Sequence, residues 1–138
     1  MGVRFSPKKL QKVDFVSGGF MMAERIKFLD YGGFDENIFM YVEDMELCFR
    51  LKKNGYNTYF SSAMSIKHVG QASSSKTFAI VNIYKGLLYF HKKHSRHFLY
   101  ILVKWLLVVK ASILVMLGKV SNNKYLIDTY EKTLAVCR

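Results

Sequence analysis

The sequence predicts an α/β domain followed by a basic, apolar helical tail. Three observations support this expectation. Between residues 13 and 69, short apolar segments typical of strands alternate with short helical patterns bounded by glycine. From Thr77 onward the pattern is helical. Of the 138 residues, 51% are hydrophobic and 15% aromatic, so the chain has enough apolar surface to form one domain with a core.

The first part of the chain is expected to contain an arm, a strand and a helix. Residues 1–12 carry four basic side chains and are predicted to be an arm or linker. Residues 13–23 form an apolar run, which predicts a buried strand with a bulge at Gly18 and Gly19. Residues 24–33 are predicted to be a short helix that ends at glycine.

A stronger helix signal covers residues 42–55, with acids in the first turn, cations in the last turn and a final Asn-Gly. Leu47 and Leu51 mark its apolar face, and counting back by three puts Asp44 on the same side. Glu46 is expected to point away from that face. The Asp44 carboxylate is therefore expected to point inward or into a cleft.

The rest of the chain changes from extended to helical segments. Residues 56–64 and 65–69 are predicted to be strands or extended segments, followed by a polar loop at 70–76. Residues 77–117 are predicted to form two helices. A last amphipathic helix is expected after a turn at residues 122–123.

The charges are distributed unevenly along the chain, whose formal net charge is +11 at pH 7. Eight of the ten acidic residues lie between Asp14 and Glu46, and none lies between Leu47 and Ile127. Such a chain suits a nucleic acid, an anionic membrane surface or a phosphorylated substrate. No nucleic-acid partner is expected, because the cations are spread among long apolar runs instead of forming a stripe with exposed aromatic residues.

The acidic pair Glu43 and Asp44, at the start of the 42–55 helix, is a candidate catalytic site. A general base needs a carboxylate at the wall of a cleft, within hydrogen-bond reach of the proton that it removes. Acids at a helix N-terminus are also favoured by the helix dipole, by roughly 0.3–1 kcal/mol each. Local chemistry alone therefore leaves a catalytic and a structural interpretation open.

Several motifs follow one another in residues 13–70. A run ending in Ser-Gly-Gly is followed by a helix, Gly-Gly-Phe-Asp-Glu, Phe-Met-Tyr, Glu-Asp, a Leu-x-x-Arg-Leu helix, Gly-Tyr, and a segment ending in His. This segment resembles the second half of the catalytic domain of inverting, family-two-type bacterial glycosyltransferases, particularly the rhamnosyltransferase-like group. The resemblance implies a partial GT-A-like fold for residues 13–76, the acceptor-side half, followed by a helical tail at 77–138.

The resemblance also implies roles for individual residues. Asp44 would be the general base that deprotonates the acceptor hydroxyl, and Glu43 would support it near the acceptor or donor. Ser17, Gly18 and Gly19 match a segment that lines the sugar pocket, where glycines allow close approach of the substrate. A simple strand bulge is the alternative interpretation of this turn.

A metal and a donor site are expected in the complete enzyme. His68 matches a His near the donor diphosphate and is a candidate ligand for Mg²⁺ or Mn²⁺, although a structural or phosphate-proximal role is the alternative. Family members hold the metal and the nucleotide sugar with an Asp-x-Asp motif, and no such tripeptide occurs in this sequence. We therefore expect a donor-binding half elsewhere, in a longer protein or on a partner chain.

The leading functional hypothesis is a portion of a glycosyltransferase that moves a sugar, with inversion, from a nucleotide-sugar donor to a lipid-linked or polysaccharide acceptor of the cell surface. The alternative is a non-catalytic acceptor-binding or membrane-tethering subunit that needs a separate donor-binding chain. The missing Asp-x-Asp motif favours the second hypothesis for this polypeptide alone, and a neighbouring reading frame that encodes a nucleotide-binding half would support a split enzyme.

The tail is expected to associate with membranes. Residues 98–117 include seventeen apolar or aromatic residues in twenty, long enough to cross a bilayer at ~1.5 Å per residue. Lys104 and Lys110 oppose a span, because each costs roughly 2.5–3.5 kcal/mol at the centre of a membrane helix. One helical face is expected to carry a polar stripe, formed by Lys93, His97, Tyr100 and Lys104.

We therefore expect an interfacial or partly inserted helix more than a full span, with a core or partner-facing helix as a further alternative. Cys48 and Cys137 are far apart and lack metal-ligand spacing, which predicts reduced thiols in the cytoplasm. The predicted location is the cytoplasmic face of the cell membrane, with a peripheral or monotopic attachment.

Overall fold

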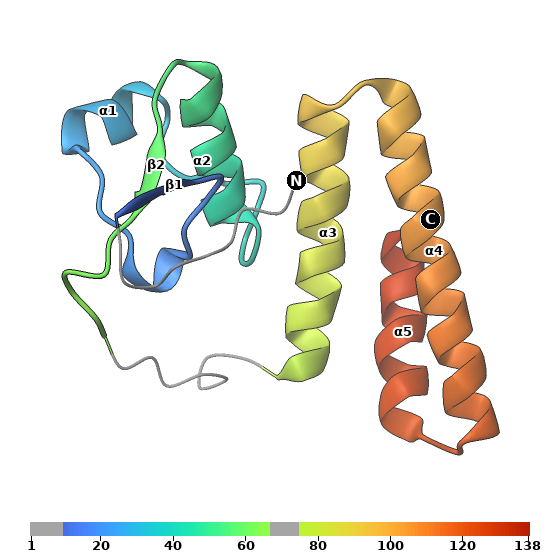
Figure 1. Ribbon diagram of the computed structural model, residues 1–138. Helices are drawn as coiled ribbons and strands as arrows, with labels where there is room; N and C mark the ends of the chain where they lie inside the picture. The colour runs from blue at the N-terminus through green and yellow to red at the C-terminus, as the bar shows by residue number, and fades with distance from the viewer. Residues whose placement is uncertain (1–9, 67–74) are drawn as a thin grey trace. The chain divides into compact units, whose positions relative to one another are not determined.

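The computed structural model describes residues 10–66 and 75–138, which fall into two compact units (Figure 1). Unit 1 comprises Met1–Asn37 and Glu43–Gly70, and unit 2 comprises Ile38–Val42 and Gln71–Arg138. The described part of the chain is mostly helical, with a two-stranded sheet in unit 1. It therefore combines helices and strands as expected, whereas the GT-A-like arrangement stays a prediction.

The sheet of unit 1 is short and antiparallel. Strand β1 covers Gln11–Val13 and strand β2 covers Thr58–Phe60. The register pairs Gln11 with Phe60 and Val13 with Thr58. Two segments 45 or more positions apart in the sequence are thus joined by backbone hydrogen bonds over three residues each.

The strand predicted at residues 13–23 is wrong apart from Val13, which belongs to β1. The 3₁₀ turn η1, Gly18–Phe20, interrupts the run, and Ser17 caps it by accepting a hydrogen bond from the Gly19 N–H. The backbone groups of a strand need hydrogen-bond partners on a neighbouring strand. Here the Ser17 side chain serves as a local partner for one such group, the Gly19 N–H. The expected burial is also wrong at Phe15 and Phe20, which are both exposed.

The strands predicted at residues 56–64 and 65–69 are largely wrong as well. The first of them contains β2 alone. In the second, residues 65 and 66 form no strand, and residues 67–69 lie outside the described residues. Pairing with β1 ends at Phe60, so nothing in the described sheet holds the following residues extended.

Helix α1, Arg25–Asp30, confirms the short helix that was expected to end at glycine. Gly33 N–H donates to the Phe28 carbonyl at 2.8 Å, and Gly32 N–H donates to the Leu29 carbonyl at 2.9 Å. Both glycines have positive φ, +81° for Gly32 and +60° for Gly33, a conformation that is unfavourable for residues with a side chain. The glycine pair therefore stops the helix and reverses the chain.

Helix α2, Glu43–Lys53, confirms the strongest helix prediction. Its first turn holds three acids and its last turn three cations, which is the favourable orientation relative to the helix dipole. Gly55, with φ +86°, follows the helix, and Tyr56 N–H donates to the Leu51 carbonyl at 3.1 Å. The same type of glycine stop thus ends both helices of unit 1.

The expected outward orientation of Glu46 is wrong, because its side chain is fully buried. Its carboxylate pairs with the Arg50 guanidinium, one turn later, at 2.7 Å. The same guanidinium also donates to the backbone carbonyls of Tyr31 and Gly33, the latter at 2.7 Å. Counting apolar positions treats Glu46 as exposed. A carboxylate can be buried when a cation pairs with it, and Arg50 supplies that cation from the next turn of the helix.

Unit 2 contains the three helices that were predicted for the tail. Helix α3 covers Lys76–His94, α4 covers His97–Val120 and α5 covers Lys124–Val136. Side chains cap α3 and α5: Ser75 accepts from Phe78 N–H, and Asn123 accepts from Leu126 N–H. The buried core of this unit is formed by Tyr84, Leu88, Ala111 and Cys137.

Helices α4 and α5 lie side by side (Figure 1). A Cβ atom at Gly118 would come within 3.0 Å of side-chain atoms of Leu126 and Ile127, so glycine permits this close approach. At the other end, the Lys104 ammonium donates to the Arg138 carbonyl at 3.4 Å. Helix α5 therefore runs antiparallel to α4 along residues 104–118.

The polar stripe predicted across the tail is wrong at Lys93. Helix α3 ends at His94 and α4 begins at His97, so Lys93 does not continue the α4 surface. By length and composition, α4 is the one helix in the described ranges that is long and apolar enough to cross a membrane. Most of its most apolar segment is not buried inside the protein.

Tyr84 offers a test of the unit 2 core. Its side chain is buried, and its hydroxyl has no hydrogen-bond partner among the described residues. Burial, together with Tyr130 and Cys137, raises the pKa of Tyr84 to about 12. A buried hydroxyl without a partner costs ~1–3 kcal/mol, so Tyr84→Phe should raise the free energy of unfolding by about 1 kcal/mol in a denaturant titration.

Tyr125→Phe is the matched control, because Tyr125 is exposed and its hydroxyl can bond to water. This change should leave the free energy of unfolding nearly unaltered. A destabilised Tyr84→Phe protein would instead indicate that the hydroxyl has a partner and stabilises the core.

Candidate functional site

Asp44 is the second residue of α2, and backbone groups hold its carboxylate from two directions. The Gly18 N–H donates to Oδ2 at 2.9 Å, and the Met45 N–H donates to Oδ1 at 2.7 Å. A carboxylate has about four lone-pair positions, so each oxygen keeps a position for a further donor. Asp44 is thus fixed in orientation and can still accept a hydrogen bond from a substrate hydroxyl.

The turn Ser17–Gly19 lies beside this carboxylate. Ser17 Oγ accepts from the Gly19 N–H at 3.4 Å, and all three residues of the turn are exposed. A Cβ atom at Gly18 would lie 3.7 Å from the Asp44 Cβ, an ordinary contact distance. Gly18 therefore contributes to Asp44 through its backbone N–H, which any residue with the same backbone could supply.

Glu43 lies next to Asp44 and is half-buried. Its Oε2 atom is buried and has no hydrogen-bond partner among the described residues. Burial raises the pKa of Glu43 above its usual range; its own backbone hydrogen bond opposes this shift, and the charge of Asp44 adds to it. The site thus combines the Asp44 carboxylate, held by two N–H groups, with the neighbouring Glu43 carboxyl, whose pKa is raised above its usual range.

The backbone just before α2 is strained. Tyr41 and Val42 have φ angles of +66° and +76°, and such values are rare for a β-branched residue. Within unit 2 this segment lies against Gly86 of α3: a Cβ atom there would come within 2.9 Å of the Val42 Cβ and 3.0 Å of the Tyr41 carbonyl oxygen. Strain of this kind often accompanies functional sites, and here it immediately precedes Glu43.

The structure brings most of the candidate residues together. The Gly18 N–H bonds directly to Asp44, although 26 positions separate them in the sequence. No local sequence signal announces this contact, whereas the i,i+4 spacing of Glu46 and Arg50 could have revealed their ion pair. His68 lies outside the described residues, and its proposed role stays a prediction.

The same residues offer few ligands for a metal ion. Within the described ranges, no group of three or more His, Cys, Asp or Glu side chains could hold a metal ion. Glu43 and Asp44 are adjacent carboxylates with no third such ligand beside them in the described ranges. The described residues therefore do not by themselves form the metal site that the resemblance implies.

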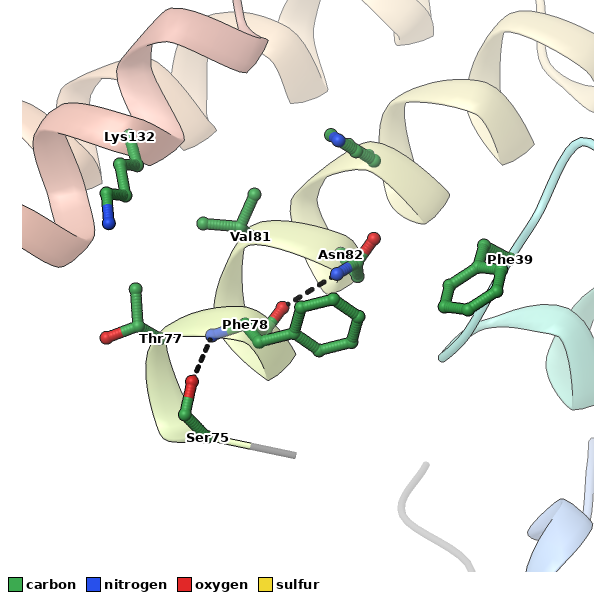
Figure 2. Close-up of a pocket in the computed structure, with 8 residues that line it drawn as sticks. Phe39, Ser75, Thr77, Phe78, Val81, Asn82 and Lys132 are labelled. Carbon is green, nitrogen blue, oxygen red and sulfur yellow. Dashed lines mark hydrogen bonds between the residues drawn. The ribbon is translucent and has the colours of Figure 1, made fainter. Parts of the chain in front are cut away.

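Unit 2 has a second candidate site, a pocket of about 490 Å³ beside the start of α3 (Figure 2). Its apolar part includes Phe39 and Phe78, whose rings pack edge to face with their centroids 6.3 Å apart. Its polar part includes two cations, Lys85 of α3 and Lys132 of α5. The lining residues are Phe39, Ser75, Thr77, Phe78, Val81, Asn82, Lys85 and Lys132.

The pocket is preorganised on its polar side. Ser75 caps α3 at Phe78, and the Asn82 side-chain amide donates to the Phe78 carbonyl at 2.9 Å, as Figure 2 shows. The Thr77 hydroxyl bonds to the Thr129 hydroxyl at 2.7 Å, which links α3 to α5. Because its charged lining residues are both lysines, the pocket suits an anion that carries an apolar group.

Part of the chain is similar in sequence to known rhamnosyltransferases. The chain is 33% identical over 67 residues to the rhamnosyltransferase WbbL of Escherichia coli (strain K12), a match that covers 49% of this chain and 25% of that protein. It is 39% identical over 66 residues to the N-acetylglucosaminyl-diphospho-decaprenol L-rhamnosyltransferase of Mycobacterium tuberculosis, covering 47% and 21% respectively. The chain resembles a fragment of a rhamnosyltransferase-like glycosyltransferase.

This finding confirms the resemblance that the motifs indicated. The matched segment spans about a quarter of the length of the rhamnosyltransferases. No family model matches the chain, and no solved structure does. The likeness to rhamnosyltransferases is therefore one of sequence, and the roles of Ser17, Gly18, Gly19, Glu43 and Asp44 rest on the geometry described above and on the motifs.

The raised pKa of Glu43 predicts a pH-dependent effect on stability. A carboxyl whose pKa is higher in the folded than in the unfolded state lowers stability once the pH exceeds the unfolded value of about 4.3. Glu43→Gln should therefore raise the melting temperature at pH 7. The difference from wild type should vanish well below that value, where Glu43 is protonated in both states.

Glu36→Gln is the matched control, because Glu36 is exposed and should give the same melting temperature as wild type at both pH values. A lower melting temperature for Glu43→Gln at pH 7 would indicate that the ionised carboxylate has a stabilising partner, contrary to this prediction.

Proposed function

We propose that the chain is part of an inverting glycosyltransferase that transfers a sugar from a nucleotide-sugar donor to a lipid-linked or polysaccharide acceptor. The observation that carries the proposal is the Asp44 carboxylate, held by the Gly18 and Met45 N–H groups at the N-terminus of α2. The names of the relatives support it, since both are rhamnosyltransferases and one names a decaprenol-linked acceptor. We propose rhamnose as the sugar because both names contain it, and a role in cell-surface polysaccharide synthesis because the motif resemblance implies one.

In this proposal Asp44 is the general base. The acceptor hydroxyl donates a hydrogen bond to a free lone pair of the carboxylate. As the hydroxyl oxygen bonds to the anomeric carbon of the donor, its proton passes to Asp44 and the bond to the nucleoside diphosphate breaks, with the electron pair leaving on the diphosphate. Attack opposite the leaving group inverts the anomeric carbon. The two backbone N–H groups keep the carboxylate aligned throughout.

Glu43 and the turn have supporting roles in this proposal. Glu43 lies next to the base, and we assign it a supporting role near the acceptor or donor; its Oε2 is buried, so it would reach a sugar hydroxyl only after the side chain rotates. Ser17, Gly18 and Gly19 are exposed beside Asp44 and would line the sugar pocket. The Gly18 N–H donates to the Asp44 carboxylate. The backbone turn that would line the sugar pocket therefore also helps to position the base.

The donor and its divalent metal are proposed to bind elsewhere in the complete enzyme. Because the described residues do not form a three-ligand metal group, Mg²⁺ or Mn²⁺ and the donor diphosphate would need ligands outside those residues, either His68 or groups of a donor-binding half. When bound, the metal would neutralise the diphosphate leaving group. The proton transfer to Asp44 itself involves only this chain and the acceptor.

The proposed location is the cytoplasmic face of the cell membrane. Helix α4 is long and apolar enough for membrane association, and a lipid-linked acceptor such as that named for the mycobacterial relative would be found there. The basic residues of the tail suit an anionic lipid surface.

The test of Asp44 is its replacement by asparagine in the complete enzyme or with a donor-binding half supplied. Asn keeps the size of the side chain and has one oxygen that can accept from one of the two N–H groups, but it is a much weaker proton acceptor. General-base catalysis typically contributes ~10²- to 10⁴-fold, so turnover should fall by about that factor while acceptor binding persists. The measurement is the rate of sugar transfer with saturating donor.

Asp30→Asn is the matched control, since Asp30 is an exposed aspartate at the end of α1. It should keep wild-type turnover. Glu46→Gln is unsuitable as a control, because it would weaken a buried ion pair. Full activity of Asp44→Asn, or an equal loss in Asp30→Asn, would remove Asp44 from the role of base.

A second candidate function is non-catalytic binding of the acceptor, on a subunit that needs a separate donor-binding chain. The pocket of unit 2 favours it, because Lys85 and Lys132 can pair with a phosphate while Phe39 and Phe78 contact an apolar chain. A lipid-linked acceptor such as a diphospho-polyprenol combines these two chemistries. In this reading the chain contributes affinity for the acceptor, and Asp44 is dispensable.

Replacing both pocket lysines, Lys85→Gln with Lys132→Gln, should weaken binding of farnesyl phosphate by at least about tenfold, because a charge-assisted contact is worth ~1.5–3 kcal/mol. Titration calorimetry in detergent measures the affinity. Lys92→Gln with Lys124→Gln is the control, with one exposed lysine from α3 and one from α5 outside the pocket. Equal losses in the two double variants would indicate attraction by net charge and no pocket.

A further inference from the structure

One face of α4 is apolar and exposed along the whole helix. Its residues recur at spacings of three and four, as one side of a helix requires. Phe98 at one end and Val120 at the other are 73% and 82% exposed, so the helix ends are no better covered than its middle. We call this face the α4 stripe: Phe98, Leu102, Trp105, Leu106, Ile113, Met116, Leu117 and Val120.

The opposite face of α4 packs against the rest of unit 2. Ala111, Val115 and Gly118 are buried, and Ala111 belongs to the core that α3 and α5 share. Gly118 contacts Leu126 and Ile127 of α5. Helices α3 and α5 therefore cover the side of α4 that lies away from the stripe.

The charges around the α4 stripe identify its occupant. The lysines of α4 lie beside the stripe: Lys110 and Lys119 are exposed, and Lys104 reaches the Arg138 carbonyl on the α5 side. No acidic residue occurs between Leu47 and Ile127, which includes all of α3 and α4. The basic segment ahead of α4 adds Lys92, Lys93, His94, Arg96 and His97.

An apolar stripe bordered by cations complements a bilayer with anionic headgroups, because the apolar side chains meet the acyl chains while lysine ammonium groups reach the phosphates. A partner protein would need an apolar groove of the same length together with acidic margins. The bilayer offers both features over any length of helix.

The packing of α5 decides how α4 meets the bilayer. Helix α5 lies along residues 104–118, so a spanning α4 would carry α5 into the hydrocarbon with it. Glu131 and Lys132 are exposed on α5 and would then lie within the hydrocarbon, where charged side chains are strongly disfavoured, with Asp128 nearer its edge. With α4 parallel to the surface, the stripe enters the acyl region and these charges stay in water.

We infer that α4 lies flat in the interface of an anionic membrane, with the α4 stripe in the acyl boundary and α3 and α5 on the aqueous side. The chain is thereby attached to one leaflet and does not cross the bilayer. This inference deepens the proposed membrane location and does not depend on the role of Asp44. Its chemical partner is the lipid surface itself.

The first test is flotation of the full chain with vesicles of phosphatidylcholine containing about one third phosphatidylglycerol. Wild type should float with them and much less with pure phosphatidylcholine. Ile113→Glu should lower the affinity by at least about tenfold, because a charge enters the centre of the stripe. The matched control is Ile26→Glu, at an exposed isoleucine of α1, which should float like wild type.

The second test separates a surface helix from a span and uses wild type alone. Trp105 is the single tryptophan of the chain and belongs to the α4 stripe. In a surface helix it should be quenched most by lipids brominated close to the headgroup. In a span it would lie near the middle of the bilayer, and lipids brominated deep in the acyl chain would quench it most.

The outcomes distinguish the two levels of the proposal. Vesicle binding with deep quenching overturns the surface orientation and leaves the membrane location intact. Absence of vesicle binding overturns both, and neither outcome bears on Asp44. A detergent-free dimer that Ile113→Glu dissociates, without lipid binding, would assign the stripe to a second copy of the chain and overturn the inference.

Discussion

Unit 1 depends on the ion pair between Glu46 and Arg50. The Glu46 carboxylate is completely buried, and an isolated charge there would be very costly. The Arg50 guanidinium offers five donors in a rigid fork and uses them on Glu46 and on the carbonyls of Tyr31 and Gly33. Loss of one partner from such a pair typically costs ~3–5 kcal/mol, a large share of the stability of a small domain.

This ion pair also connects the helix stop of α1 to the candidate site. Glycine at positions 32 and 33 turns the chain so that the carbonyls of Tyr31 and Gly33 reach the guanidinium. The guanidinium in turn fixes α2, which carries Asp44 two residues before Glu46 and six before Arg50. Asp44 then receives the Gly18 N–H at 2.9 Å. The position of the proposed base is thus set by buried electrostatics, with little help from the two short strands.

In unit 2 the decisive constraint is that α4 has one covered and one uncovered side. Spanning a bilayer would place Glu131 and Lys132 of α5 in hydrocarbon, where the lysine alone costs up to roughly 2.5–3.5 kcal/mol and the glutamate adds a further penalty. The eight residues of the α4 stripe would return roughly 2–5 kcal/mol on the same scale. A surface orientation avoids the cost of burying the α5 charges and keeps much of the gain from the apolar stripe. The packing of α5 therefore favours a surface orientation. The Lys104 contact with the Arg138 carbonyl removes one of the two lysines from the apolar side.

The sequence by itself determined the helices, their glycine stops, the acids at the start of α2 and the resemblance to rhamnosyltransferases, because these depend on periodicity, caps and residue order that are local in the chain. It did not determine the strands, since a strand exists only where a distant segment pairs with it, as Gln11–Val13 does with Thr58–Phe60. Tertiary structure alone decided that Gly18 bonds to Asp44, that the Glu46–Arg50 pair is buried and reaches the carbonyls of Tyr31 and Gly33, and that the Lys104 side of α4 faces α5. Each of these contacts depends on chain segments or side chains whose meeting is set by packing, and an apolar-face count sees only one helix at a time.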